Sequence, residues 1–136
     1  MLSVRALGVL GGRGVRDWVH TEGHSSAVWA ILARGVPGET YLVGADGERD
    51  NVTGMREILR EMGQAPDAFD WVRDRPGHDR RYAIDSTKLR RELGWLPRHS
   101  DFAEGLAATI GWYRENEAWW RPAKEATEAK YARQGQ

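Results

Sequence analysis

Apolar side chains recur at helical spacing in several stretches of the chain, and each stretch is bounded by residues that begin or end helices. The first predicted helix has Thr21 as its N-cap and is stopped by Gly35 and Pro37. In the second, Asn51 is the candidate N-cap and Gly63 occupies the position after the last turn, where glycine is favoured.

Two further helices follow in the second half of the sequence. A short one opens at Asp85 or Ser86 and ends at Gly94. The other begins after Asp101, and Asp101 with Glu104 has the spacing of a capping box. The chain is therefore expected to be rich in amphipathic helices.

Strand signals are fewer and shorter than helix signals. The β-rich segments are 39–43, 69–72 and, more weakly, 82–84. Helices alternating with strands predict a mixed α/β fold, with a few short strands covered by four or five helices. Such a narrow sheet has exposed edges and is marginal alone, so the pattern suggests part of a larger protein or a subunit that packs against a partner.

The length of 136 residues predicts a single domain over 1–136, with a poorly defined start at 1–14 and a C-terminal tail at 122–136. Pro122 predicts a break, followed by a polar helix over 123–134. No apolar run approaches the roughly 20 residues needed to cross a bilayer, and the start lacks the pattern of a secretory signal. We therefore expect a soluble, cytoplasmic protein.

Charge and composition narrow the function. Lys and Arg number 20 and Asp and Glu number 20, and this balance argues against a nucleic-acid or membrane-surface partner. The absence of cysteine excludes disulfides, thiolate catalysis and Cys-ligated metals. Seven Trp are spread over the chain, which favours packing between elements over a single stacking platform.

The region with the most concentrated charge runs from Arg73 to Arg91 and contains seven basic and three acidic residues. A turn at Pro76-Gly77 lets arginines converge from a loop, where their guanidinium groups can bind phosphate oxygens. The alternative is a solvated loop held by Arg–Asp pairs, each worth about 0–1 kcal/mol. Composition by itself favours this second interpretation.

Two weaker polar clusters lie elsewhere. Arg16 follows a glycine-containing turn that could cradle an anion, although the segment is no phosphate-binding fingerprint. Asn51 follows a polar loop between a predicted strand and a predicted helix, where ligands bind in α/β proteins. His20 and His24 stand four residues apart, but no metalloprotease pattern accompanies them and Gly23 interrupts the segment. We expect no metal site and no nucleophile-based catalytic site.

A resemblance to a known family rests on longer motifs. The chain carries RPGHDRRYAID over 75–85, LRRELGWLP over 89–97, VRDW over 15–18, ERDN over 48–51, and FxxG and NxxWW from Phe102 and Asn116. Together these resemble the C-terminal, substrate-binding region of dTDP-D-glucose 4,6-dehydratases, which are extended short-chain dehydrogenase/reductase enzymes of deoxysugar biosynthesis.

The resemblance implies roles for three residues. Arg16 and Asn51 would contact the diphosphate of a nucleotide sugar of the dTDP-glucose type, and His78 would lie at its nucleotide end. The three weak clusters would then form one anion-binding site. No catalytic residue of the family is matched in the chain.

The family uses tightly held NAD, which the resemblance assigns to an N-terminal Rossmann half. Its dinucleotide fingerprint, its Tyr-x-x-x-Lys pair and its Thr-Asp-Glu segment do not occur among the 136 residues. We therefore expect no cofactor in this chain and no activity by the chain alone. The rival interpretation is a non-catalytic interaction module that docks on a Rossmann partner or self-associates.

Overall fold

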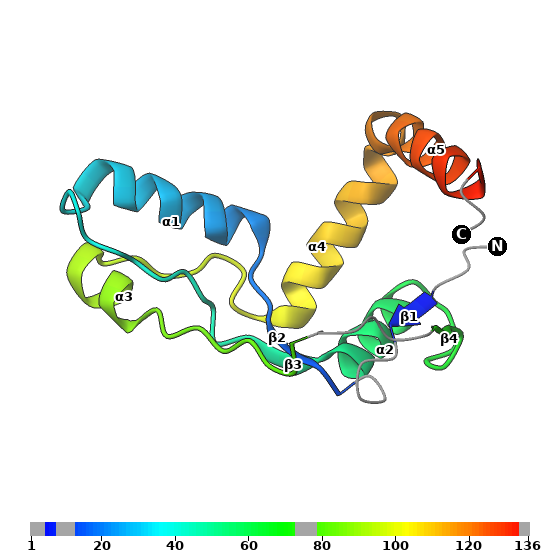
Figure 1. Cartoon of the computed structure of the whole chain (residues 1–136), viewed down its shortest axis with the longest axis horizontal. Helices are drawn as coiled ribbons and strands as arrows, with labels where there is room; N and C mark the ends of the chain where they lie inside the picture. The colour runs from blue at the N-terminus through cyan, green and yellow to red at the C-terminus, as the bar shows by residue number, and fades with distance from the viewer. Residues whose placement is uncertain (1–4, 8–12, 73–78, 134–136) are drawn as a thin grey trace.

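The computed structural model describes residues 5–7, 13–72 and 79–133. The helices are α1 (Thr21–Arg34), α2 (Asn51–Glu61), α3 (Thr87–Leu93), α4 (Phe102–Glu115) and α5 (Glu117–Arg133), and the strands are β1 (Arg5–Leu7), β2 (Val15–Asp17), β3 (Glu48–Asp50) and β4 (Asp70–Val72). In Figure 1, α1 and α3 lie at one end, β1, β4 and α2 lie toward the other, and β2 and β3 lie between them. The expected mixed α/β fold with few short strands is confirmed.

The described strands form two separate pairs. β1 and β4 are parallel, whereas β2 and β3 are antiparallel with Val15 opposite Asp50. β4 confirms the strand predicted over 69–72, but its partner β1 was not predicted. None of the described helices combines the length and apolar character needed to span a bilayer.

Helix positions follow the sequence closely, and their caps do so in part. Asp101 accepts a hydrogen bond from the Glu104 N–H at 2.9 Å, as the capping-box spacing predicts. Gly63 directly follows the C-cap of α2 with φ of 71°, a left-handed conformation that glycine adopts without strain. These local signals therefore fix where α2 ends and α4 begins.

Two predicted N-caps are wrong by one residue. The caps of α1 and α2 are His20 and Asp50, because these residues have extended backbones and side chains that accept N–H groups of the first turn. Thr21 and Asn51 are instead the first helical residues. The polar side chain of Asn51 is thereby released from capping.

Two predicted strands and one predicted helix break are also wrong. Segment 39–43 is irregular because no described strand pairs with it, and Tyr41 and Val43 pack against the helical core. Segment 82–84 forms no strand, since the parallel contact with β2 is a single bridge at Arg81. α5 continues through Pro122 because the break falls earlier, at Asn116, whose backbone and side-chain N–H groups both donate to the Trp112 carbonyl.

The core of the described residues lies between α1 and α3. Its buried members are Ala27, Ala30, Leu89, Leu93 and Trp95. The Trp95 indole N–H donates to the Ser26 hydroxyl at 2.9 Å, and Arg34 donates to the Leu93 carbonyl at 2.7 Å. Small alanines on α1 allow α3 to approach closely, so this helix pair is the best-packed part of the chain.

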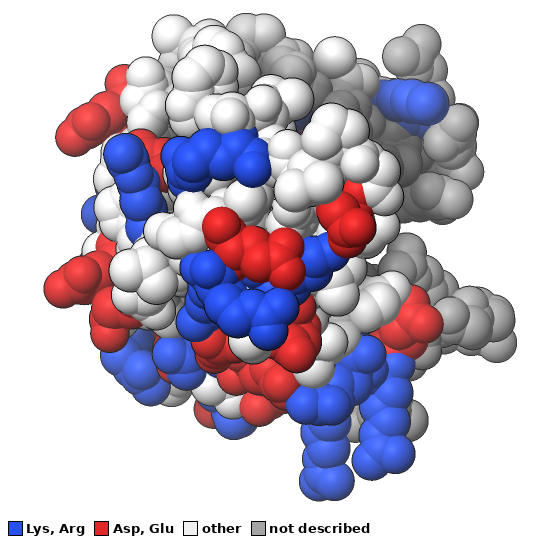
Figure 2. All heavy atoms as spheres, turned by 90° about the vertical axis from the view of Figure 1, so that its left-hand side faces the viewer, with Lys and Arg blue, Asp and Glu red and all other residues white. Residues whose placement is uncertain are grey.

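Figure 2 shows the face of the molecule at the α1 and α3 end, where basic and acidic side chains are interleaved. Ion pairs account for part of this pattern, including Lys88 with Glu39 at 2.5 Å and Arg90 with Asp46 at 2.7 Å. The hydrogen bond and charge of Glu39 raise the pKa of Lys88, and Lys88 lowers the pKa of Glu39. Mixed charge of this kind does not make an anion-binding surface.

Replacing Leu89 with alanine is expected to destabilise the chain by about 2–5 kcal/mol, because Leu89 is fully buried and its loss leaves a cavity. The matched control is Leu32→Ala, since Leu32 is 75% exposed on α1 and its truncation should change stability by less than about 0.5 kcal/mol. Urea unfolding followed by tryptophan fluorescence measures both. Equal effects of the two substitutions would contradict the assigned core.

Candidate functional site

The β2 segment is hydrogen-bonded along both of its edges. On one edge, the Gly14 carbonyl accepts from the Asn51 N–H at 3.0 Å and the Trp18 N–H donates to the Gly47 carbonyl at 3.2 Å. On the other edge, the Val15 N–H donates to the Arg80 carbonyl at 2.9 Å. Three segments that are remote in sequence, around 14–18, 47–51 and 79–82, are thereby joined in one small sheet.

Arg16 reaches across this sheet toward the 79–82 segment. Its guanidinium donates to the Val15 carbonyl at 2.7 Å and to the Asp79 carbonyl at 2.9 Å, and it lies 4.5 Å from the centre of the Tyr82 ring. The Tyr82 hydroxyl in turn donates to the Asp79 carboxylate. These contacts hold the guanidinium in place, while its fork of five N–H donors offers more than the two bonds named.

Asn51 is carried by the junction of β3 and α2. The Asp50 carboxylate accepts from the Thr53 N–H and hydroxyl, each at 2.8 Å, and so caps the helix. Burial by itself would raise the pKa of Asp50, but the hydrogen bonds from Thr53 outweigh it and lower that pKa. Because Asp50 supplies the cap, the half-buried Asn51 amide is available to a ligand at the helix start.

Asp17 positions the loop before β3, a role that sequence patterns did not reveal. Its carboxylate accepts from the Gly47 N–H at 2.9 Å and from the Ala45 N–H at 3.2 Å. Gly47 must be small, since a Cβ there would lie 2.4 Å from the Trp18 carbonyl oxygen. In the sequence, the one feature that could have indicated this role is the position of Asp17 next to Arg16 in the VRDW motif.

Arginines gather around the three joined segments. Arg13, Arg80 and Arg81 line a cavity of about 600 Å³ together with Val15. Arg16 and Arg49 are directly opposite each other across the β2–β3 pair. Their guanidinium groups are held by different neighbours, that of Arg16 by backbone carbonyls and that of Arg49 by Glu57 and Phe102.

The neighbouring groups neutralise these arginines only in part. Arg81 forms a two-bond ion pair with Glu48, at 2.8 and 3.0 Å. Arg49 lies 3.5 Å from a Glu57 oxygen and stacks on Phe102 at 4.3 Å, and its buried Nε has no hydrogen-bond partner. The ion pair of Arg81 is what the solvated-loop interpretation of 73–91 expects, whereas Arg49 lies outside that region.

A second, larger cavity of about 730 Å³ lies between α1 and α4. Aromatic residues dominate its wall, and they include Trp18, Phe102, Trp112 and Trp119. Trp18 meets Phe102 edge to face at 6.0 Å between ring centres. This cavity offers apolar contact area beside the cationic sheet.

The structure brings two of the three predicted site residues together. Arg16 and Asn51 lie on adjacent hydrogen-bonded segments. His78 lies outside the described residues, and the next residue in sequence, Asp79, accepts the hydrogen bond from Arg16. Sequence reasoning missed Asp17 and Arg49.

Comparison with known proteins gives the family. The model of the GDP-mannose 4,6 dehydratase family matches residues 5–109, and the chain belongs to this family. A dTDP-glucose 4,6-dehydratase of Mycolicibacterium smegmatis is 59% identical over 125 residues. The resemblance inferred from the sequence motifs is thereby confirmed.

Solved structures show the same fold. A dTDP-glucose 4,6-dehydratase from Streptomyces venezuelae, solved with NAD bound, superposes with a TM-score of 0.80 at 40% identity and covers 88% of this chain. A Bordetella bronchiseptica enzyme in complex with NAD+ and UDP superposes with a TM-score of 0.68 at 25% identity over 90% of the chain. The chain spans 38% of the length of the M. smegmatis relative, 37% of the S. venezuelae chain and 35% of the B. bronchiseptica chain.

Asp50→Ala is expected to destabilise α2 by about 0.5–2 kcal/mol at neutral pH through loss of the cap, whereas Asp50→Asn keeps an acceptor and should lose less. Because the pKa of Asp50 is lowered in the folded state from 3.8, its ionised form stabilises the fold above about pH 4, and this contribution is lost as the pH falls below that value. The amide introduced by Asp50→Asn cannot titrate, so that variant should lose less stability on acidification. Urea unfolding at pH 6 and pH 3 measures the difference, and identical acid sensitivity of wild type and Asp50→Asn would contradict the assignment.

Proposed function

We propose that this chain binds a nucleotide sugar of the dTDP-glucose type, as part of a dTDP-glucose 4,6-dehydratase-like protein of deoxysugar biosynthesis of the dTDP-rhamnose kind. In this proposal Arg16 and Asn51 contact the diphosphate, and His78 lies at the nucleotide end. The relatives named dTDP-glucose 4,6-dehydratase support the sugar nucleotide. NAD would be held by a Rossmann half that these 136 residues do not include.

The observation that carries the proposal is the joining of 14–18, 47–51 and 79–82 by backbone hydrogen bonds. Each segment supplies donors suited to an anion: a guanidinium from the first, an amide at a helix start from the second, and arginines from the third. A diphosphate carries several acceptor oxygens and can use donors from more than one direction.

A further support is electrostatic. Arg13, Arg80 and Arg81 surround a cavity next to Val15, whereas the chain as a whole has no net charge. The positive charge belongs to the wall of this cavity, since the three joined segments together contain four basic and four acidic residues. The B. bronchiseptica relative, solved with UDP, is a structural neighbour that holds a nucleoside diphosphate.

The proposal assigns binding of the nucleotide sugar to this chain, but not dehydration of the sugar. The family reaction needs a hydride acceptor and an acid/base pair, and the sequence has no dinucleotide fingerprint and no Tyr-x-x-x-Lys pair. We therefore assign binding to these 136 residues and no catalytic step. Residues that hold a substrate without reacting groups lower no chemical barrier.

An interaction module is the second candidate, and exposed apolar side chains favour it. Val28, Trp29 and Leu32 are all exposed on α1, with Trp29 71% accessible. Such a cluster is a candidate contact surface for a Rossmann partner or for a second copy of the chain. Binding of dTDP by the isolated chain distinguishes the two functions, since a pure interaction module would bind none.

Arg16→Ala is expected to weaken dTDP binding by about 10- to 100-fold, because it removes a charge-assisted hydrogen bond to the diphosphate. Arg16→Lys should bind with intermediate affinity, since a lysine keeps the charge but loses the planar fork. Isothermal titration calorimetry with dTDP and with dTDP-glucose measures each variant.

The matched control is Arg56→Ala, because Arg56 forms an exposed ion pair with Asp67 away from the site. This variant should bind dTDP as the wild type does. Absence of dTDP binding at millimolar ligand in the wild type, or equal loss in the Arg56 and Arg16 variants, would refute the site.

Incubation of the chain with NAD and dTDP-glucose is expected to yield no 4-keto-6-deoxy sugar. The reason is that the sequence has neither the acid/base pair of the family nor the fingerprint that holds NAD as hydride acceptor. Product is measured by its alkaline absorbance and by mass spectrometry. Detection of product by the purified chain alone would overturn the separation of binding from catalysis.

A further inference from the structure

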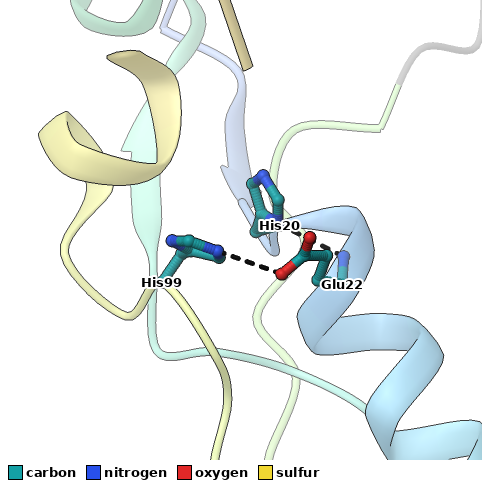
Figure 3. A group of neighbouring side chains, drawn as sticks. All are labelled: His20, Glu22 and His99. Carbon is teal, nitrogen blue, oxygen red and sulfur yellow. Dashed lines mark hydrogen bonds and ion pairs between the residues drawn. The ribbon is translucent and has the colours of Figure 1, made fainter. Parts of the chain in front are cut away.

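Two histidines and a glutamate from distant parts of the sequence meet at the start of α1. Figure 3 shows His20, Glu22 and His99 pointing toward one another, with His99 arriving from the loop before α4. One ligand atom from each residue lies within 4.8 Å of the other two. The His99 Nε2 is 3.2 Å from a Glu22 carboxylate oxygen. The group lies in the wall of the aromatic cavity, apart from the arginine-rich sheet.

We propose that His20, Glu22 and His99 bind one divalent transition-metal ion of the zinc type. Imidazole nitrogens and a carboxylate oxygen are ligands that zinc prefers, and two histidines with one glutamate leave a fourth position open. The expectation from sequence considered only His20 with His24. In the structure the second imidazole comes from His99, whose separation from Glu22 by 77 positions hides it from any local motif.

The role of His20 as the N-cap of α1 orients its Nδ1 lone pair toward Glu22. Its Nδ1 accepts the Glu22 backbone N–H at 3.2 Å, so the neutral ring carries its proton on Nε2 and keeps a lone pair on Nδ1. Figure 3 shows that this edge of the ring faces Glu22. The metal would take over the Nδ1 lone pair, and the loss of a single long cap hydrogen bond is small beside three coordination bonds.

His99 is held in place by its backbone and by its neighbours. It has φ of 53°, a left-handed conformation that non-glycine residues adopt rarely. Its ring packs against that of His20 at an angle of 51°, with 4.3 Å between the ring centres. Gly105 makes room for it, since a Cβ on Gly105 would lie 3.3 Å from the His99 Cβ.

The distances require only a modest contraction. Ligand bonds to zinc of roughly 2.0–2.2 Å place neighbouring ligand atoms about 3.3 Å apart in a tetrahedron. The 3.2 Å between His99 and Glu22 already meets this value. The Glu22 side chain is 59% exposed and contacts His99 through one carboxylate oxygen, so a small adjustment of this side chain and of the His20 ring would complete the site. The open fourth position is reached through the cavity between α1 and α4.

The test is zinc binding by the full 136-residue chain, freed of metal by a chelator and then titrated with zinc chloride in a calorimeter. We expect one zinc ion per chain. Cobalt(II) in place of zinc should give the intense visible absorption of a tetrahedral site. A wild-type chain that binds no zinc at 100-fold excess, or that gives only the weak absorption of aqueous cobalt, would overturn the proposal.

Three variants remove one ligand each and are chosen to preserve the fold. Asparagine replaces His20 because it is a favoured N-cap, and it replaces His99 because it tolerates the left-handed backbone. Glu22→Gln keeps the shape of the side chain. Each should weaken zinc binding by at least about tenfold.

The matched control is His24→Asn, because His24 is exposed on the same helix one turn later. It should bind zinc as the wild type does. Circular dichroism of the metal-free variants reports whether each is folded. Zinc binding that survives all three ligand substitutions, or that falls equally in the His24 variant, would refute this site.

Discussion

The placement of Arg16 and Asn51 depends on the double pairing of one short segment. Residues 14–18 donate and accept backbone hydrogen bonds on both edges, to 47–51 on one side and to 80–82 on the other. Backbone bonds of this kind do not depend on which side chains are present, so they fix a frame on which side chains can vary. Arg16 then faces the third segment because its own strand runs beside it, and Asn51 follows because β3 leads directly into α2.

The sequence left two interpretations of the region Arg73–Arg91: a loop that binds an anion, and a solvated loop held by ion pairs. Arg81 is used in a bidentate pair with Glu48, and Arg90 in a pair with Asp46, as a solvated and self-neutralised loop would require. Arg49 lies outside that region, and its buried Nε has no hydrogen-bond partner; the same holds for the buried Nη2 of Arg90 in spite of its ion pair with Asp46. The pairs of Arg81 and Arg90 favour the solvated interpretation, so the proposed anion site rests on Arg16 and Asn51 and not on the charge of the 73–91 region.

Local order was predictable, whereas pairing between distant segments was not. Helix ends such as Gly63 and Asp101 follow from signals within a few residues, and the caps of α1 and α2 were missed by one position because Thr21 and Asn51 are also good cap formers. A strand needs a partner, and segment 39–43 has the composition of a strand but none of the described strands beside it. For the same reason motifs could identify Arg16 and Asn51 through a family resemblance, while Arg49 and His99 emerge only from contacts across the fold.

The tryptophans show why binding and catalysis can be assigned separately. Packing between elements was expected of them, and Trp95 fulfils it within the core, whereas Trp29 and Trp119 are largely exposed. Exposed apolar side chains of this kind are candidate contact surfaces, and the relatives are much longer than this chain. The proposed diphosphate site, by contrast, takes its frame, its loop and its arginines from segments within the 136 residues. Under this proposal a ligand is bound by groups already held in place, and binding needs neither a hydride acceptor nor an acid/base pair.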